Sequence, residues 1–136
     1  MTIGVLERIR ARALGKLRPP QRLPLSEWIE QEMVLPAGVA DTPGKVELWP
    51  FQAGIADAMS DPDIEEITLV KPTRVGFTTL LSGYVASHVA NDPAPLGVYL
   101  PTEDDCRTYM VSVLEPIFDA TVAVRGALGS GVDQTG

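Results

Sequence analysis

The sequence predicts an α/β fold: part of a mostly parallel sheet with flanking helices, preceded by a basic N-terminal helix. Three observations predict it. Residues 67–70 and 96–100 are short, apolar and bounded by turn residues, as buried strands are. A helical apolar stripe follows each of them, and strand, loop, helix, strand, turn, helix is the order of an open parallel sheet. Cations are concentrated at the N-terminus.

The first element expected is a basic amphipathic helix over residues 3–17, ended by Pro19 and Pro20. Residues 1–22 hold one acid, Glu7, and six cations, whereas the whole chain has a net charge of −7. Contact with nucleic acid or an acidic partner surface is one interpretation, and a merely solvated helix is the other. The six cations are Arg8, Arg10, Arg12, Lys16, Arg18 and Arg22.

Two shorter helices should follow. Ser26 stands where an N-cap belongs, ahead of the apolar residues Trp28 and Ile29. Residues 35–50 carry three prolines and two glycines, so we expect an irregular loop with one extended piece near residues 45–48. Residues 51–59 then predict a helix, because Pro50 suits the first helical position.

Helical spacing returns after each predicted strand. The first stripe comprises Phe77, Leu80, Leu81, Tyr84, Val85 and Val89, and the second comprises Cys106, Tyr109, Met110, Val113 and Leu114. We expect residues 126–136, which are rich in glycine, to be disordered. The chain therefore divides into a basic helix and linker (1–22), an α/β part (23–125) and a tail (126–136).

Residues 71–79, KPTRVGFTT, join the first predicted strand to its helix. A loop there can aim main-chain N–H groups and a helix N-terminus at phosphates. In the phosphate-loop pattern GxxxxGK[ST], the second glycine falls on Gly76 and the hydroxyl on Thr78, but Lys71 replaces the first glycine and Phe77 replaces the lysine. The long side chain of Lys71 can swing back over the loop. The alternative is an ordinary polar turn.

The loop resembles the variant phosphate loop of the large terminase subunit of tailed phages, the lambda-type or GpA family of DNA-packaging ATPases. Lys71, Arg74, Val75, Gly76 and Thr78 carry this resemblance. Other stretches resemble the family in the same order, over roughly residues 23 to 120. They are Leu25–Trp28, Val34–Pro36, Pro43–Lys45, Trp49–Gln52, Asp92–Pro93 and Leu100–Glu103.

The resemblance implies a P-loop ATPase that uses ATP and Mg²⁺. Lys71 would be the catalytic cation on the β- and γ-phosphates, and Thr78 would hold the metal. Gln52 would bind the adenine edge, unless it is simply solvated, whereas we expect Trp49 to pack in the core. Arg74 would contact phosphate or a neighbouring subunit. The remaining cofactor-binding residues implied by the loop are Thr73, Val75, Gly76, Phe77 and Thr79.

The acidic motif that orients magnesium and the attacking water has no convincing copy. Glu103, Asp104 and Asp105 follow the second predicted strand, but acids there also suit a helix N-terminus. The resemblance places the acidic motif and a nuclease domain further along the family's chain. We therefore expect an N-terminal fragment that is not active alone, although the family is an ATPase and endonuclease.

The resemblance implies as partners double-stranded viral DNA, the small terminase subunit and the capsid portal, and an oligomer when the protein is complete. No apolar run approaches the roughly 20 residues that span a bilayer, so we expect no membrane contact. The single cysteine, Cys106, fits a reducing compartment, here the host-cell cytoplasm. Two alternatives stay open: a degenerate, non-catalytic DNA- or protein-binding module, and part of a helicase-like ATPase.

Overall fold

The computed structural model describes residues 2–17 and 22–129. Arg18, Pro19 and Pro20 and residues 130–136 of the expected tail lie outside the described residues. The elements, in order, are helix α1 (Thr2–Leu17), α2 (Leu25–Glu32), strands β1 (Val34–Leu35) and β2 (Gly44–Lys45), α3 (Pro50–Ser60), α4 (Phe77–Ala90), α5 (Glu103–Tyr109), the π-helix η1 (Met110–Leu114), α6 (Glu115–Ala120) and α7 (Val122–Gly129).

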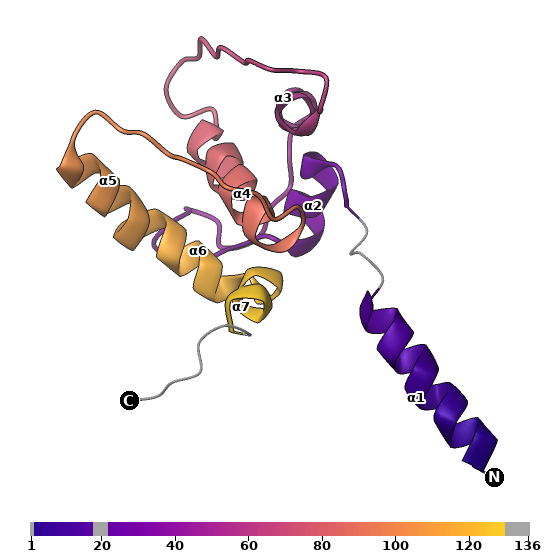
Figure 1. Ribbon diagram of the computed structural model, residues 1–136. Helices are drawn as coiled ribbons and strands as arrows, with labels where there is room; N and C mark the ends of the chain where they lie inside the picture. Colours follow the sequence, from indigo (N-terminus) through magenta and orange to yellow (C-terminus); the bar gives the residue numbers. More distant parts are fainter. Residues whose placement is uncertain (1, 18–21, 130–136) are drawn as a thin grey trace.

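Helix α1 stands apart from the other helices (Figure 1). Its existence confirms the first sequence prediction. The apolar side chains of Ile3, Leu6 and Ile9 are largely exposed, as is the rest of the helix from residue 3 to residue 14. The apolar stripe read from the sequence is therefore not buried against this chain.

Helix α2 lies at the centre of the core. Leu25, Trp28 and Ile29, spaced at i, i+3 and i+4, are all buried. The N-cap is Pro24, so Ser26 lies inside the first turn and the sequence placed the cap two residues too late. The cluster is completed by Met33, Leu35, Val46, Ala56, Leu80, Ala86, Ile117 and Val124.

Helix α4 has the predicted extent but buries a different face. Of the predicted stripe only Leu80 is buried, while Ser82, Gly83, Ala86 and Ser87 are also buried. A Cβ on Gly83 would lie 2.6 Å from Cδ1 of Ile29, so α2 approaches this face closely. The small side chains on this face of α4 permit that close approach. The sequence prediction was different: it placed the larger apolar residues of α4 against a sheet.

The parallel sheet is absent from the described part of the chain. Residues 67–70 and 96–100 are not strands there, and Val70 and Tyr99 are 97% and 93% exposed. The ladder that is present pairs β1 with β2 antiparallel, through Val34 with Lys45 and Leu35 with Gly44. An extended, β-branched segment becomes a strand only when a neighbour supplies ladder hydrogen bonds, and residues 2–17 and 22–129 supply none to either segment.

Helices α5, η1 and α6 run nearly in line beside α4, and α7 folds back at their end (Figure 1). Five residues of this rod, Met110–Leu114, form a π-helix, where the sequence predicted one regular helix over residues 106–114. Helix α7 ends at Gly129, so residues 126–129 are helical rather than disordered as expected. No helix in the described ranges is both long and apolar enough to cross a bilayer.

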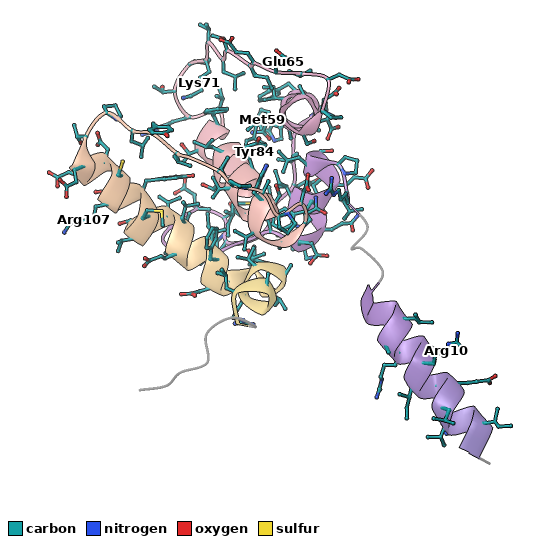
Figure 2. All side chains as sticks on the ribbon, viewed as in Figure 1. Arg10, Met59, Glu65, Lys71, Tyr84 and Arg107 are labelled. Carbon is teal, nitrogen blue, oxygen red and sulfur yellow. The ribbon has the colours of Figure 1, made fainter. Side chains whose placement is uncertain are left out.

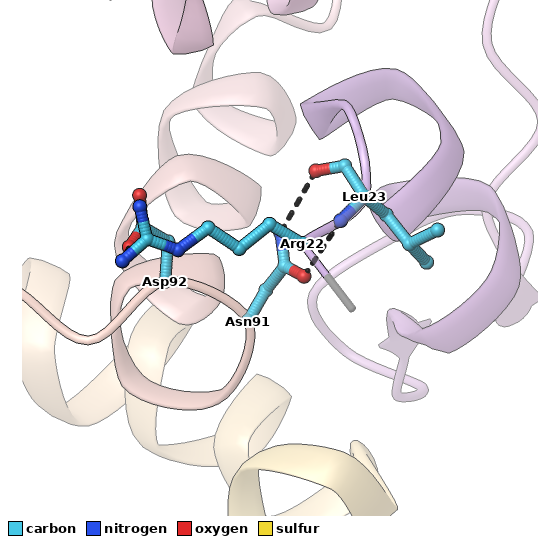
Figure 3. A network of polar contacts seen from close by, with 4 residues as sticks. All are labelled: Arg22, Leu23, Asn91 and Asp92. Carbon is cyan, nitrogen blue, oxygen red and sulfur yellow. Dashed lines mark hydrogen bonds and ion pairs between the residues drawn. The ribbon is translucent and has the colours of Figure 1, made fainter. Parts of the chain in front are cut away.

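Asn91, at the end of α4, joins that helix to the segment that precedes α2 (Figure 3). The Leu23 N–H donates to Asn91 Oδ1 at 3.1 Å, and Asn91 Nδ2 donates to the Leu23 carbonyl at 2.9 Å. Arg22 and Asp92 form an ion pair at 3.0 Å beside these bonds. Both main-chain groups of Leu23 are thus satisfied, which fixes the start of α2 against α4.

Candidate functional site

The loop of residues 71–76 leads directly into α4, as the sequence predicted. Gly76 is the N-cap of α4 and has a left-handed backbone, with φ 74° and ψ 17°. Arg74 has φ 62° and is the non-glycine residue with positive φ among the described residues. Turns that contain left-handed residues can bring neighbouring N–H groups together as an anion-binding concavity, and this loop has two such residues, Arg74 and Gly76.

The N-terminus of α4 is free of side-chain caps. Gly76 provides no capping side chain, and no acidic residue stands in the first turn. The first N–H groups of a helix lack intrahelical partners, and the helix dipole is positive at this end. Thr78, the second residue of α4, is exposed there. This end of the helix is therefore suited to an anion.

Lys71 folds back toward the start of α4. Its Nζ lies 5.9 Å from the centroid of the Phe77 ring, a cation–π contact. Phe77 occupies the position that the ordinary phosphate-loop pattern gives to lysine. Figure 2 shows Lys71 on the loop next to the N-terminal end of α4. The ammonium thus lies near the side chain that replaces the pattern lysine, and its phosphate-binding role stays a prediction.

Gln52 of α3 is hydrogen bonded to main chain at both ends of its amide. Its Oε1 accepts from the Trp49 N–H, and its Nε2 donates to the Val75 carbonyl, both at 2.9 Å. A Cβ on Gly76 would lie only 2.6 Å from Gln52 Nε2. The side chain expected to bind adenine thus ties helix α3 to the loop before α4, and its adenine role stays a prediction.

A cleft of ≈ 630 Å³ lies beside this tie. Trp49 and Phe51 line it as an edge-to-face pair with ring centroids 5.8 Å apart. Trp49 is 67% exposed, so the prediction that it packs in the core is wrong. Its place before Pro50, at the very start of a helix, leaves little neighbouring structure to cover it. The two rings offer apolar surface to an aromatic ligand.

The acids after the second extended segment belong to a helix start. Glu103, Asp104 and Asp105 form the first turn of α5, and the Asp105 N–H donates to Thr102 Oγ1 at 3.1 Å. Thr102 Oγ1 donates in turn to Asp105 Oδ2 at 2.7 Å. Within the described ranges, no group of three or more His, Cys, Asp or Glu residues is arranged to hold a metal.

The predicted site residues fall into two groups. Gln52, Arg74, Val75, Gly76 and Thr79 line the cleft. The second group, outside the cleft lining, is Lys71, Thr73, Phe77 and Thr78, on the loop and the first turn of α4. The stretch Trp49–Gln52 was singled out by its resemblance to the family, but Trp49 was predicted to pack in the core and no role was predicted for Phe51.

Comparison with known proteins gives a family. Residues 40–136 match the family described as phage terminase large subunit gpA, ATPase domain. The large terminase subunit of Escherichia phage lambda is 32% identical over 108 residues, which cover 79% of this chain and 17% of that protein. The large terminase subunit of Enterobacteria phage P21 is 32% identical over 106 residues, which cover 78% and 16%.

The chain thus spans about a sixth of the length of these relatives. No solved structure matches the chain significantly. The family match contains the loop, the N-terminus of α4 and most of the cleft lining. The chain belongs to the family of the phage terminase large subunit gpA, ATPase domain.

Proposed function

We propose that this chain binds ATP with Mg²⁺ and is the nucleotide-binding part of a motor that packages viral DNA into capsids. The observation that carries the proposal is the position of Lys71, folded over Phe77 at an uncapped helix N-terminus. A cation, oriented N–H groups and a helix dipole at one point form an arrangement suited to phosphate.

In this proposal each loop residue has a role. Lys71 neutralises the β- and γ-phosphates, and the amides from Thr73 to Gly76 cradle them. Thr78 holds Mg²⁺ through its hydroxyl, and the amides of Phe77 and Thr79 extend the cradle into α4. The base lies in the cleft beside the Trp49 and Phe51 rings, while Gln52 holds the loop in place. Arg74, at positive φ beside the cleft, contacts phosphate.

A titration of the 136-residue chain with fluorescently labelled ATP and Mg²⁺ tests the proposal. We expect Lys71→Ala to weaken binding at least tenfold, since a charge-assisted hydrogen bond contributes about 1.5–3 kcal/mol. Arg10→Ala removes the same charge from exposed α1 and is the matched control, with unchanged affinity expected. Equal affinities for wild type and Lys71→Ala would remove the loop from the proposal.

We further infer that residues 67–70 and 96–100 are strands of a parallel P-loop-type sheet when longer family polypeptide pairs with them. Their apolar composition and exposed side chains support this inference, since unpaired apolar strands are unfavourable in water. Hydrogen exchange tests it. The amides of both segments should exchange fast in this chain and at least tenfold more slowly in a longer terminase polypeptide.

ATP turnover and DNA cleavage belong, in this proposal, to the complete protein, acting as an oligomer on double-stranded DNA at the capsid portal in the host cytoplasm. Helix α1 supplies the contact with DNA or with the small terminase subunit. Its separation from the body and its exposed Arg8, Arg10 and Arg12 favour such a role.

One alternative function keeps some support. A non-catalytic DNA- or protein-binding module would use α1 alone, and it predicts salt-dependent DNA binding with no effect of nucleotide. Nucleotide binding that depends on Lys71 would argue against it. The helicase-like alternative has lost its basis, because the family match is to the terminase ATPase domain.

A further inference from the structure

A pair of hydroxyl groups links α4 to α5 close to the loop. Ser82, one turn after Thr78, is 0% exposed. Its Oγ donates to the Thr78 carbonyl at 2.7 Å and lies 3.0 Å from the Tyr109 hydroxyl oxygen. Neither residue was assigned a role by the sequence beyond helical packing.

The direction of these bonds follows from counting protons. A serine hydroxyl has one proton, and the Thr78 carbonyl can only accept, so the proton of Ser82 is committed there. The Tyr109 hydroxyl must therefore donate to Ser82 Oγ. Burial raises the pKa of the Tyr109 phenol above its usual value, so Tyr109 keeps its proton at neutral pH and remains a donor. The chain of bonds runs from Tyr109 through Ser82 to the main chain of Thr78.

Tyr109 stands at a junction of elements. It is the last residue of α5, and the π-helix Met110–Leu114 begins directly after it. Short π-helical turns inside helices frequently occur at functional positions. No residue of α5 is buried, so this helix has little apolar packing of its own. The half-buried Tyr109 side chain provides a specific polar attachment of α5 to α4.

Thr78 belongs both to the proposed nucleotide site and to the chain of hydrogen bonds that starts at Tyr109. A serine that hydrogen bonds back to the carbonyl four residues earlier bends a helix slightly, so the Ser82 bond shapes the first turn of α4. We propose that Tyr109 is a positioning residue of the nucleotide site: through Ser82 it sets the first turn of α4, and it couples occupancy of that site to the ordering of α5. This inference rests on the proposed nucleotide function and adds a regulatory link to the same site.

The test uses the full chain and two measurements, labelled-ATP affinity with Mg²⁺ and hydrogen exchange of α5 with and without Mg-ATP. In the wild type, Mg-ATP should slow exchange in Glu103–Tyr109, because coupling between a site and a helix is reciprocal. In Tyr109→Phe, affinity should fall about three- to tenfold, the size of one hydrogen bond, and the α5 response should disappear. The ring remains, so packing is retained.

Tyr99→Phe is the matched control, because Tyr99 is 93% exposed and loses an identical hydroxyl. It should behave as the wild type in both measurements. Ser82→Ala should reproduce the Tyr109→Phe effects, and the double variant should be no weaker than Ser82→Ala, since the two hydroxyls act in series.

The outcomes distinguish failure of the Tyr109 coupling from failure of the nucleotide-binding function. If the wild type binds Mg-ATP in a Lys71-dependent manner but Tyr109→Phe keeps both the affinity and the α5 response, the coupling is wrong and the nucleotide function stands. A lower melting temperature in Tyr109→Phe with unchanged affinity also overturns it, since Tyr109 is then structural only. If the wild type binds no nucleotide, both proposals fail.

Discussion

At the residue scale, Gln52 has two possible roles in nucleotide binding: contact with the adenine base, or support of the loop before α4. An adenine contact would act on the base alone, whereas the observed bonds to Trp49 and Val75 hold the loop that would bind phosphates. Both ends of the amide are hydrogen bonded to main chain, so a role in holding the loop is supported by contacts of the structure, while the adenine contact stays a prediction. The distinction matters for specificity, since a loop tie contributes equally for every nucleotide.

We predict that Gln52→Ala weakens binding of ATP and of inorganic tripolyphosphate by the same factor, about tenfold, because two hydrogen bonds that hold the loop are removed. Competition titrations of both ligands against labelled ATP measure this. Phe51→Ala is the comparison variant: it should weaken ATP but leave tripolyphosphate unchanged. A Gln52→Ala effect confined to ATP would restore the adenine contact.

Gly76 provides a second prediction at this scale. Alanine there would hold a left-handed backbone, at a cost of about 1–2 kcal/mol, and its Cβ would lie 2.6 Å from Gln52 Nε2. Gly76→Ala should therefore lower the free energy of unfolding, or else displace Gln52 and weaken ATP binding. Urea unfolding and the ATP titration detect the two effects.

The control for this change is Gly54→Ala. Gly54 lies inside α3, has no positive φ, and has open space around its would-be Cβ. Alanine there should stabilise the chain by about 0.5–1 kcal/mol, because it restricts the unfolded state. A Gly76→Ala variant as stable and as tight-binding as wild type would show that neither the left-handed backbone nor the approach of Gln52 requires glycine.

At the element scale, the contact of α2 with α4 depends on Gly83. The hypothetical Cβ would meet Ile29 Cδ1 at 2.6 Å and Met33 Sδ at 3.2 Å. Gly83→Ala should cost about 1–3 kcal/mol by overpacking, outweighing the helix propensity gained. Gly126→Ala in α7, with nothing near its Cβ, should be neutral or stabilising. Urea midpoints give both values, and equal midpoints would mean that α2 moves away without loss.

The same contact explains the orientation of α4. Phe77 and Tyr84 are only partly buried at the edge of the core, whereas Ser82, Gly83, Ala86 and Ser87 are buried, with α2 packed on Gly83. A helix with apolar residues all around has more than one possible packed face. The buried face of α4 is determined by the helices that pack against it, since no sheet covers the larger residues in the described part of the chain.

At the scale of the whole molecule, charge is divided between α1 and an acidic body. We predict that replacing Arg8, Arg10 and Arg12 together by alanine weakens DNA binding and lowers the salt slope of log K by about 2.7, at about 0.9 for each phosphate that is no longer neutralised. Fluorescence anisotropy with a DNA duplex at several salt concentrations measures this.

Stability should be untouched by the same triple change. Helix α1 stands apart from the core in Figure 1, so the free energy of unfolding should stay within about 0.5 kcal/mol of wild type. Lys71→Ala is the control for DNA binding and should leave the salt slope unchanged. DNA affinity that survives the triple change would place the DNA contact elsewhere.

Much of the fold was predictable because its signals are local. Periodicity and the placement of Pro50 and Gly76 gave the positions of α1, α3 and α4 and of the loop before α4, and the structure confirms these. The roles of Lys71 and Thr78 stay predictions. Periodicity did not reveal the π-helix, because one inserted residue per turn leaves little trace in a short apolar pattern.

Sequence alone was enough to locate most helices, to locate the loop that precedes α4 and, through the loop motif, to indicate the family. It took the tertiary structure to establish that Gln52 holds Val75, that Trp49 is exposed, that α4 buries its small residues, and that residues 67–70 and 96–100 stay unpaired. The difference is one of range. Helices and turns are specified by neighbours along the chain, whereas strand pairing, side-chain ties and buried faces depend on which distant segments are present to complete them.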